Sequence, residues 1–98
     1  MSILATADFY VKPEKSEEFL GLLKEALPDT RGFKGCEHLD TYVDQDDPGH
    51  VFLVETWGAR GDHESYLGWR METGMMDMLA PYATAPPKFT YFDARPEI

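Results

Sequence analysis

The segment Val51-Phe52-Leu53-Val54-Glu55-Thr56-Trp57 decides the fold, because almost every position along it is apolar. The main exceptions are Glu55 and Thr56. An almost continuous apolar run of this length predicts a strand that is covered on both faces, whereas a strand with one face in water alternates between apolar and polar residues. We therefore expect a sheet that has helices on one face and a further protein surface on the other.

A second strand precedes this segment and forms a hairpin with it. The strand is predicted over Cys36–Val43, and the polar stretch Asp44–His50, which contains Pro48-Gly49, predicts the connecting turn. One face of this strand carries Cys36, His38, Asp40 and Tyr42. A one-residue slip in register exchanges the faces of a strand. Two pairings therefore stay open for that face: with Leu53, Glu55 and Trp57, or with Phe52, Val54 and Thr56.

Two helices flank the hairpin in the sequence. The first is predicted over Lys15–Leu27, where apolar residues recur at the spacing of one helix face, and Pro28 and Gly32 are expected to end it. The second is predicted over Asp62–Leu79. Its first residue can act as the N-cap, and Gly74 is a weak point inside it.

The two ends of the chain supply the outer strands. Ile3–Val11 alternates between two faces, and Lys88–Asp93 forms a short last strand after a proline-rich exit from the second helix. The order β-α-β-β-α-β is the ferredoxin-like arrangement, an α+β fold with an antiparallel sheet. Two helices cover only one face of a four-stranded sheet, and a second copy of the chain is the simplest cover for the other. We therefore expect a homodimer joined through the sheet faces.

Length and charge exclude several classes of protein. The 98 residues fit a single domain, 1–98, and the 18 acidic and 9 basic side chains give a formal charge of −9. Nucleic acids and anionic membrane surfaces attract clustered Lys and Arg, so neither is expected as a partner. Cys36 is the only cysteine, which excludes an internal disulfide and a thiolate zinc site. Without a signal-peptide pattern or a membrane-spanning stretch, a cytoplasmic location is expected.

Several short motifs occur along the chain in the same order as in a known protein family. They are Lys12-Pro13, Glu18-Phe19, Leu22-Leu23, Gly35-Cys36, Asp44, Asp47-Pro48, Val51 to Val54 and Glu55-Thr56-Trp57. In this order, from Ile3 to Asp93, the chain resembles the antibiotic biosynthesis monooxygenase (ABM) family. The resemblance implies a dimeric α+β barrel, with a ligand cavity between the sheet and the helices of each subunit.

Members of that family catalyse different reactions, so the fold alone does not fix the function. Some oxidise anthrone- or quinol-type aromatics with oxygen and without a metal or flavin, others degrade haem, others isomerise small phosphorylated sugars, and some have no known activity. The haem-degrading members use an Asn on the first strand and a His on the last helix. This sequence has no Asn, and it carries Gly74-Met75-Met76-Asp77 where that His is found. Other members have a His on the second helix where this chain has Tyr66-Leu67. Haem degradation is therefore not expected.

The second helix carries the residues best suited to chemistry on an aromatic compound. His63, Tyr66 and Arg70 are spaced i, i+3 and i+7, so they share a helix face, and Trp69 lies beside them. Arg70 can hold a phenolate or enolate oxygen, and His63 can accept a proton near neutral pH. We predict His63 and Arg70 as catalytic residues. The predicted substrate-binding residues are Tyr42, Trp57, Tyr66 and Trp69.

Each of these side chains also has a purely structural interpretation. His63 can be exposed to solvent, because it lies near the start of its helix. Tyr66 and Trp69 can be ordinary core residues at helical spacing. Arg70 can pair with a carboxylate, and the candidates for that pair are Glu55, Glu64 and Glu72.

No metal site is predicted. His38, His50 and His63 lack the spacing of metal ligands, and the acidic run Asp44–Asp47 lacks the spacing of a calcium-binding loop. We interpret that run as a solvated turn with His50 exposed in it. Cys36 has no neighbouring base and is interpreted as a small buried apolar residue.

The leading hypothesis is a cofactor-independent monooxygenase that acts on an aromatic or quinol-type small molecule, and it requires no cofactor. The alternative is a non-catalytic dimeric module of the same fold that binds a small apolar or aromatic ligand. Isomerisation of a sugar phosphate is disfavoured, because the chain carries a charge of −9 and few basic side chains near the expected cavity.

Overall fold

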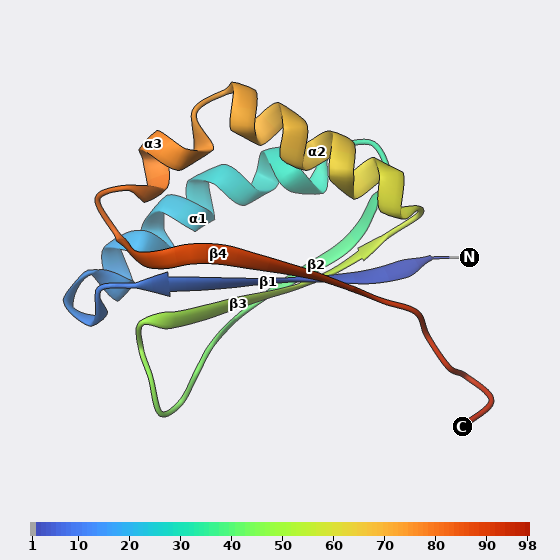
Figure 1. Ribbon diagram of the computed structural model, residues 1–98, viewed down its shortest axis with the longest axis horizontal. Helices are drawn as coiled ribbons and strands as arrows, with labels where there is room; N and C mark the ends of the chain where they lie inside the picture. The colour runs from blue at the N-terminus through green and yellow to red at the C-terminus, as the bar shows by residue number, and fades with distance from the viewer. Residues whose placement is uncertain (1) are drawn as a thin grey trace.

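The computed structural model describes residues 2–98, and its elements follow the predicted order. They are β1 (Ile3–Val11), the 3-10 turn η1 (Pro13–Lys15), α1 (Ser16–Arg31), β2 (Cys36–Val43), β3 (His50–Trp57), α2 (Arg60–Glu72), α3 (Met75–Leu79) and β4 (Ala83–Phe92). The strands form one open antiparallel sheet in the order β2-β3-β1-β4. Figure 1 shows the helices on one side of this sheet. The predicted ferredoxin-like α+β fold is confirmed.

The core lies between the helices and one face of the sheet. Alternate residues of a strand point to the same face, so β1 buries Ala5, Ala7, Phe9 and Val11 there. The helices add large apolar side chains to the same core, namely Phe19, Leu23 and Leu27 from α1 and Met75 and Leu79 from α3. Full burial of each large apolar side chain stabilises the fold by about 1.5–3 kcal/mol.

The other face of the sheet has no helix over it among residues 2–98 (Figure 1). On this open face, His38, Asp40 and Tyr42 of β2 pair with Thr56, Val54 and Phe52 of β3. The second of the two predicted registers is therefore the one that forms. The prediction that Cys36 shares this face is wrong, because a register shift before His38 places Cys36 opposite Trp57 on the helix-covered face.

The helices differ from prediction at three places. α1 continues through Pro28 to Arg31, and its last turn is anchored by the buried Thr30. The N-cap of α2 is Ala59, so Asp62 lies in the first turn, where its negative charge favours the positive end of the helix dipole. At Gly74 the chain adopts a φ of 97°, which glycine tolerates and a helix does not. The predicted weak point is therefore a complete break between α2 and α3.

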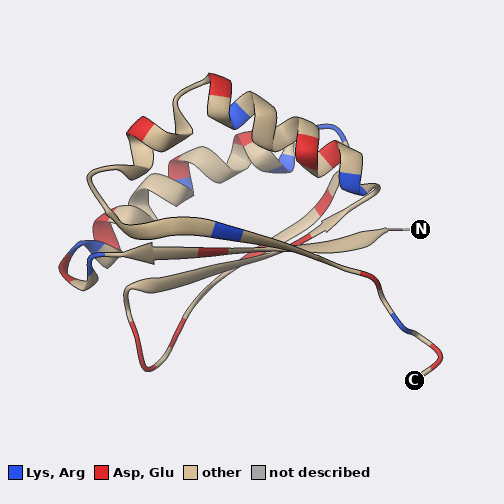
Figure 2. Ribbon diagram, in the orientation of Figure 1, with Lys and Arg blue, Asp and Glu red and all other residues tan. Residues whose placement is uncertain are grey.

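Two strand boundaries also differ. β4 begins at Ala83 and includes Pro86 and Pro87, which were expected to lie in the exit from the helix. An edge strand tolerates proline, because one side of it needs no ladder hydrogen bonds. His50 begins β3 instead of lying in the turn. Acidic residues are spread over the helices, the hairpin turn and the C-terminal tail (Figure 2). Within residues 2–98, no helix has both the length and the apolar character needed to cross a membrane.

Candidate functional site

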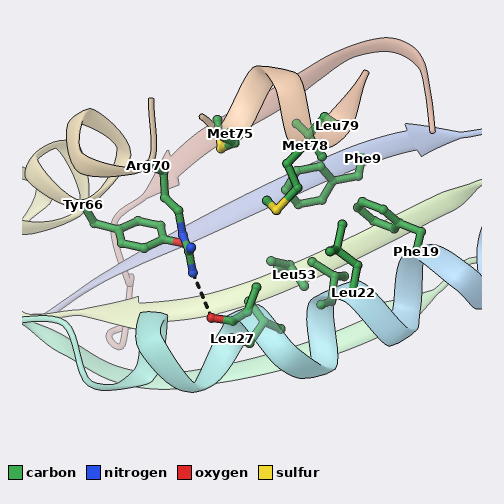
Figure 3. Close-up of a pocket in the computed structure, with 12 residues that line it drawn as sticks. Phe9, Phe19, Leu22, Leu27, Leu53, Tyr66, Arg70, Met75, Met78 and Leu79 are labelled. Carbon is green, nitrogen blue, oxygen red and sulfur yellow. Dashed lines mark hydrogen bonds between the residues drawn. The ribbon is translucent and has the colours of Figure 1, made fainter. Parts of the chain in front are cut away.

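A small apolar cavity lies between the sheet and the three helices (Figure 3). Its apolar walls include Phe9 and Leu53 from the sheet, Phe19, Leu22 and Leu27 from α1, and Met75, Met78 and Leu79 from α3. Its polar wall is made by Tyr66 and Arg70 of α2. The helix face predicted from the spacing of these two residues is therefore turned toward the interior.

Hydrogen bonds fix the polar wall of the cavity. Arg70 Nε donates to the Tyr66 hydroxyl oxygen at 2.8 Å, and Nη2 donates to the Ala26 carbonyl at 2.8 Å and to Thr30 Oγ1 at 3.0 Å. The hydroxyl oxygens of Tyr66 and Thr30 lie 2.7 Å apart. Because both oxygens already accept from Arg70, one hydroxyl hydrogen bridges them and the other stays free to donate.

Arg70 has no carboxylate partner within residues 2–98. The arginine ion pairs there are Arg60–Glu64 and Arg95–Glu97, so the expected alternative of an Arg70–carboxylate pair is wrong. The guanidinium instead lies 4.7 Å from the ring centroid of Trp69 and 5.4 Å from that of Tyr66. A half-buried cation that is held only by neutral oxygens and aromatic faces is able to bind an anion.

The cavity is too small for an aromatic ring in this conformation. Its volume is about 40 Å³, which has room for water, whereas an engineered cavity of about 150 Å³ binds benzene. Its adaptable side is α3, since Met75 and Met78 have flexible side chains and follow the chain break at Gly74. A ring-sized ligand therefore requires the cavity to widen, and α3 is the side that the flexible methionines line.

A second buried polar cluster lies beside the cavity, nearer the end of β3. Trp57 Nε1 donates to Glu55 Oε1 at 2.9 Å, and His63 Nε2 lies 3.8 Å from the same oxygen. His63 Nδ1 lies 2.7 Å from the hydroxyl oxygen of Tyr91 on β4. Tyr91 is half-buried, whereas Glu55 is 2% and His63 1% exposed. The cluster therefore runs from the core toward the surface.

Burial sets the charge of this cluster. Loss of hydration lowers the pKa of His63 to about 4, against a smaller opposite effect of the Glu64 carboxylate. At 3.8 Å the Glu55 carboxylate is too far to hydrogen-bond the ring and offset that loss. Burial also raises the pKa of the Glu55 carboxyl, although the hydrogen bond from Trp57 acts in the opposite direction. His63 is therefore a neutral imidazole near pH 7.

The structure brings together five of the six predicted site residues. Trp57, His63, Tyr66 and Trp69 form one aromatic group, with ring centroids 5.4 Å apart for Trp57–Tyr66, 5.2 Å for Trp57–His63 and 6.2 Å for Tyr66–Trp69, and Arg70 lies over Trp69. Only Tyr66 and Arg70 of these line the cavity. Tyr42 is separate from them, because it lies on the open face of the sheet and is 54% exposed.

Three residues of these clusters were not predicted from the sequence, namely Thr30, Glu55 and Tyr91. Glu55 did carry a signal, since it is one of the two exceptions in the apolar run of β3. Thr30 and Tyr91 carried none. Thr30 reaches Tyr66 across 36 residues of sequence, and Tyr91 reaches His63 across 28. No local pattern reports such contacts.

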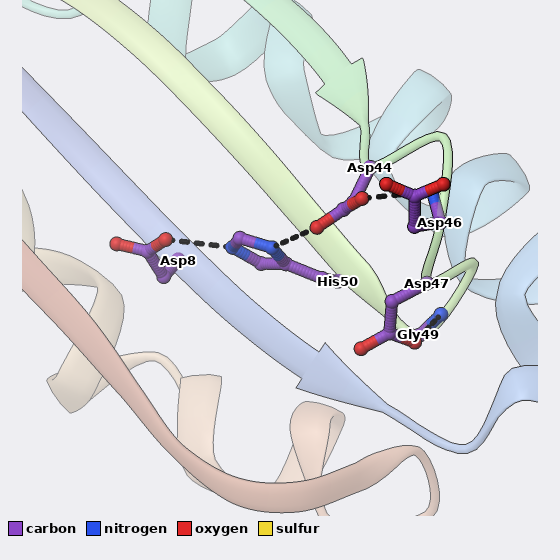
Figure 4. Close-up of polar contacts among 6 residues, drawn as sticks. All are labelled: Asp8, Asp44, Asp46, Asp47, Gly49 and His50. Carbon is purple, nitrogen blue, oxygen red and sulfur yellow. Dashed lines mark hydrogen bonds and ion pairs between the residues drawn. The ribbon is translucent and has the colours of Figure 1, made fainter.

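The open face carries a separate charged cluster at its hairpin end (Figure 4). His50 Nε2 lies 2.7 Å from Asp8 Oδ1, and Nδ1 lies 3.1 Å from Asp44 Oδ2. The expectation that His50 is simply exposed is therefore wrong. Hydrogen bonds that the His50 ring donates to the two carboxylates, to Asp8 first, raise the pKa of His50. No group of three metal-ligating side chains is found among residues 2–98.

Comparisons with known proteins agree with this architecture. The family model described as "Antibiotic biosynthesis monooxygenase" matches residues 2–70. A crystal structure described as an antibiotic biosynthesis monooxygenase is 26% identical and superimposes with a TM-score of 0.82, covering 96% of this chain and 99% of that one. No curated protein sequence matches the chain.

Two further solved structures share the fold at lower identity. A conserved protein from Methanosarcina mazei Go1 is 21% identical with a TM-score of 0.82, covering 97% of this chain and 94% of its own. Rv0793 from Mycobacterium tuberculosis is 21% identical with a TM-score of 0.80, covering 97% of this chain and 96% of its own. Neither likeness carries information beyond the fold.

Proposed function

The chain belongs to the antibiotic biosynthesis monooxygenase family, and from this premise we propose that it oxidises an aromatic or quinol-type small molecule with molecular oxygen. The observation that carries the proposal is Arg70. It is a half-buried cation without a carboxylate partner within residues 2–98, and it lies at the wall of an apolar cavity. A deprotonated phenol or enol supplies the missing anion together with an apolar ring.

For an anthrone-type substrate, the proposed reaction converts an activated methylene into a carbonyl: R₂CH₂ + O₂ → R₂C=O + H₂O. For a hydroquinone, the same balance gives a hydroxyquinone: C₆H₆O₂ + O₂ → C₆H₄O₃ + H₂O. In each case the substrate loses two hydrogens and gains one oxygen atom, and the second oxygen atom leaves as water. The substrate supplies all four electrons that O₂ accepts, so no further reductant enters the balance. The enzyme needs only to favour the substrate anion, orient it and exclude water.

Arg70 and Tyr66 are the residues proposed to bind that anion. The Nη1 nitrogen of Arg70 makes no hydrogen bond with residues 2–98 and is available to an oxyanion. The remaining hydroxyl hydrogen of the Tyr66–Thr30 pair is a second donor. In an apolar surrounding, such donors stabilise a developing negative charge more strongly than water does. Trp69 stacks beside the guanidinium and supports its orientation.

Entry of the substrate is proposed to open the wall formed by α3. The break at Gly74 lets this short helix swing without disturbing α2, and the methionines adapt to the shape of the ligand. Substitution of Met78 by Ala should enlarge the cavity and strengthen binding of anthrone, which has three fused rings.

The open sheet face is proposed to pair with the same face of a second copy. This face exposes Leu4, Tyr42 and Phe92, which are 36%, 54% and 48% exposed. A partner sheet would remove them from water, a favourable change of about 25 cal/mol for each Å² of apolar surface. Light scattering at micromolar concentration tests this, and a monomer there contradicts the homodimer.

The test of the activity uses anthrone and a substituted hydroquinone, with and without oxygen. We expect oxygen-dependent product formation that falls at least about 100-fold in Arg70→Ala, because removal of one oxyanion donor typically has that effect. Tyr66→Phe should lower it less. Arg31→Ala is the matched control, since Arg31 also donates from α1 to a backbone carbonyl, that of Leu39, but does not line the cavity.

A second function is favoured by one observation. Among the cavity-lining residues there is no carboxylate or imidazole, so the lining itself contains no conventional base. A non-catalytic dimeric module that binds a small apolar or aromatic ligand fits this lining. Binding of anthrone without oxygen uptake, abolished by Arg70→Ala, would favour the module over the enzyme.

A further inference from the structure

Glu55 is the most unusual side chain of the core. It is 2% exposed and is the only carboxylate among the buried residues of 2–98. The nearest ionisable side chain is that of His63, at 3.8 Å, and no Lys or Arg among residues 2–98 pairs with Glu55. Burial of a carboxylate costs several kcal/mol of lost hydration, and a glutamine would fill the same space without that cost. A group kept ionisable in such a place is a candidate for proton transfer.

Its neighbours hold the Glu55 carboxyl in a defined orientation. Oε1 accepts from Trp57 Nε1 at 2.9 Å and faces His63 Nε2 at 3.8 Å. Oε2 makes no hydrogen bond with residues 2–98. His63 is in turn fixed by the Tyr91 hydroxyl at its other nitrogen. One carboxyl oxygen is therefore anchored, and the other makes no hydrogen bond within residues 2–98.

The charges around the cluster are few. Arg60 lies over the Tyr91 ring, 4.3 Å from its centroid, and Glu64 follows His63 on α2. Cys36 contacts the cluster from β2 and Tyr66 from α2, and burial raises the pKa of the Cys36 thiol. Burial raises the pKa of Glu55 and lowers that of His63, so the loss of hydration favours the uncharged form of each side chain.

The carboxyl lies next to the proposed binding cavity. Leu53 lines the cavity, and Glu55 is the next residue of β3 on the same face. Their partners on β1 are Ala7 and Ala5, which carry only methyl groups, and Glu55 itself does not line the cavity. The Tyr66 ring lines the cavity and also packs on Trp57 and His63, at 5.4 and 5.9 Å between centroids.

We infer that Glu55 takes the proton that the substrate loses and later returns it, with His63 and Tyr91 as positioning residues. The inference rests on the proposed monooxygenation. In that reaction both hydrogens of the methylene end in the water that leaves, so a base must hold a proton during the cycle. The C–H bond breaks, its electron pair stays in the substrate anion, and an O–H bond forms on Glu55. The anion adds O₂ with formation of the new C–O bond, and Glu55 returns the first proton to the outer oxygen, which gives R₂CH–OOH. The second C–H bond then breaks toward Glu55, its electron pair forms the second bond of C=O, and the O–O bond breaks with loss of hydroxide. Glu55 passes this second proton to the hydroxide, which leaves as water.

The first test needs no substrate and uses the indole resonance of Trp57 in ¹H–¹⁵N spectra of the whole chain. Because Trp57 donates directly to Glu55, its Nε1–H resonance should shift with pH as the carboxyl ionises. Glu55→Gln should abolish this titration and His63→Gln should move its midpoint, whereas Glu72→Gln, an exposed change at the end of α2, should leave it unchanged. Retention of the full titration in Glu55→Gln overturns the inference.

The second test uses turnover of anthrone with oxygen. Glu55→Gln keeps the shape of the side chain and is expected to fold, which melting and near-ultraviolet circular dichroism check. We expect its kcat to fall at least about 100-fold, the usual contribution of a positioned base, and the acidic limb of its pH profile to disappear. Tyr91→Phe should shift that limb with a smaller loss of kcat.

Together, the spectroscopic test and the turnover test distinguish failure of the role of Glu55 from failure of the proposed monooxygenase function. If wild-type protein turns over anthrone and Glu55→Gln does so equally well, Glu55 is not the base and the monooxygenase stands. If wild-type protein never turns over either probe while the Trp57 resonance titrates through Glu55, the monooxygenase proposal fails and the role of Glu55 in that reaction fails with it.

Discussion

His50 lies on the open face of the sheet, whereas His63 of α2 packs against the opposite, helix-covered face, and their surroundings shift their pKa values in opposite directions. On the open face, His50 has a carboxylate oxygen at hydrogen-bonding distance from each ring nitrogen, and its pKa is raised. On the helix-covered face, His63 is packed among aromatic rings and its pKa is lowered to about 4. Hydrogen bonds to carboxylates therefore determine the direction of the pKa shift at His50, and lost hydration determines it at His63.

Geometry alone gives the charge of His50. A carboxylate only accepts hydrogen bonds, so both ring nitrogens of His50 must carry a hydrogen to bond Asp8 and Asp44 together. The ring in this arrangement is an imidazolium. Its plane stacks on Tyr10, with 5.1 Å between centroids and 15° between planes, and this contact holds it against the sheet. The open face of the sheet therefore holds a charged histidine, His50, whereas the histidine packed on the covered face, His63, is neutral.

Acidification should destabilise the protein through His63, and this is the largest expected effect. A histidine with a folded pKa near 4 and an unfolded pKa of about 6.5 contributes its full stability above the unfolded value and loses it as the pH falls toward 4. The loss is roughly 3 kcal/mol between pH 7 and pH 4. Urea unfolding of wild type and His63→Gln at both pH values measures it, and an equal loss in the two proteins contradicts it.

Removal of the His50 charge should lower the free energy of unfolding by less than protonation of His63 does. Its effect should also have the opposite pH dependence. Because its folded pKa is raised, the stability it adds is complete below about pH 6.5 and disappears as the pH rises through the folded value. His50→Gln should cost about 1–2 kcal/mol at pH 6, below the usual ~1.5–3 kcal/mol for hydrogen bonds to charged groups because the ring is partly exposed to water. At pH 9 the difference from wild type should vanish. A cost that persists unchanged at pH 9 would mean that packing on Tyr10 stabilises the site, and the charge does not.

The sequence predicted the order of elements because each pattern is local. Alternation along β1 and the apolar run of β3 depend on residues close in the chain. The register of β2 could not be predicted, since one bulge before His38 exchanges the faces and leaves no mark on composition. Asp62 and Pro28 misled the prediction of helix ends, because burial of Thr30 and the turn at Ala59 outweigh capping and proline propensities.

The candidate site was predictable only where it lies on one helix. His63, Tyr66 and Arg70 were placed together by their spacing on α2. Their partners Thr30, Glu55 and Tyr91 come from three other elements, and only tertiary packing brings them near. Whether His63 faces inward was open for the same reason, since an isolated helix does not report which stripe meets the sheet when aromatic residues lie on more than one side.

The two carboxylates of the open face should contribute unequally to the pKa of His50. Asp8 lies closer, at 2.7 Å against 3.1 Å, and its side chain is 16% exposed against 37% for Asp44. Asp8→Asn should therefore lower the pKa of His50 more than Asp44→Asn does. The Hε1 resonance of His50, followed against pH, measures both shifts. A larger shift in Asp44→Asn would mean that the hairpin turn, and not β1, holds the charge.

The smallest change in the free energy of unfolding is expected on substitution of His38, a third histidine whose one carboxylate partner is exposed to solvent. Its Nε2 lies 2.8 Å from Asp40 Oδ2, a distance as short as those at His50, but the two side chains are 65% and 47% exposed. Water competes for such a pair, so His38→Gln should change the free energy of unfolding by no more than about 0.5 kcal/mol. Asp40→Asn is the matched control and should change the free energy of unfolding equally little.

This measurement belongs at concentrations where light scattering finds a monomer, because the proposed second copy would cover His38 along with the rest of the open face. A small effect in the monomer that grows with protein concentration would place His38 in the dimer interface. A cost in the monomer equal to that of His50→Gln would contradict the comparison itself, since short distances would then matter more than exposure. Exposure should decide, because a hydrogen bond stabilises a fold only to the extent that water cannot replace it.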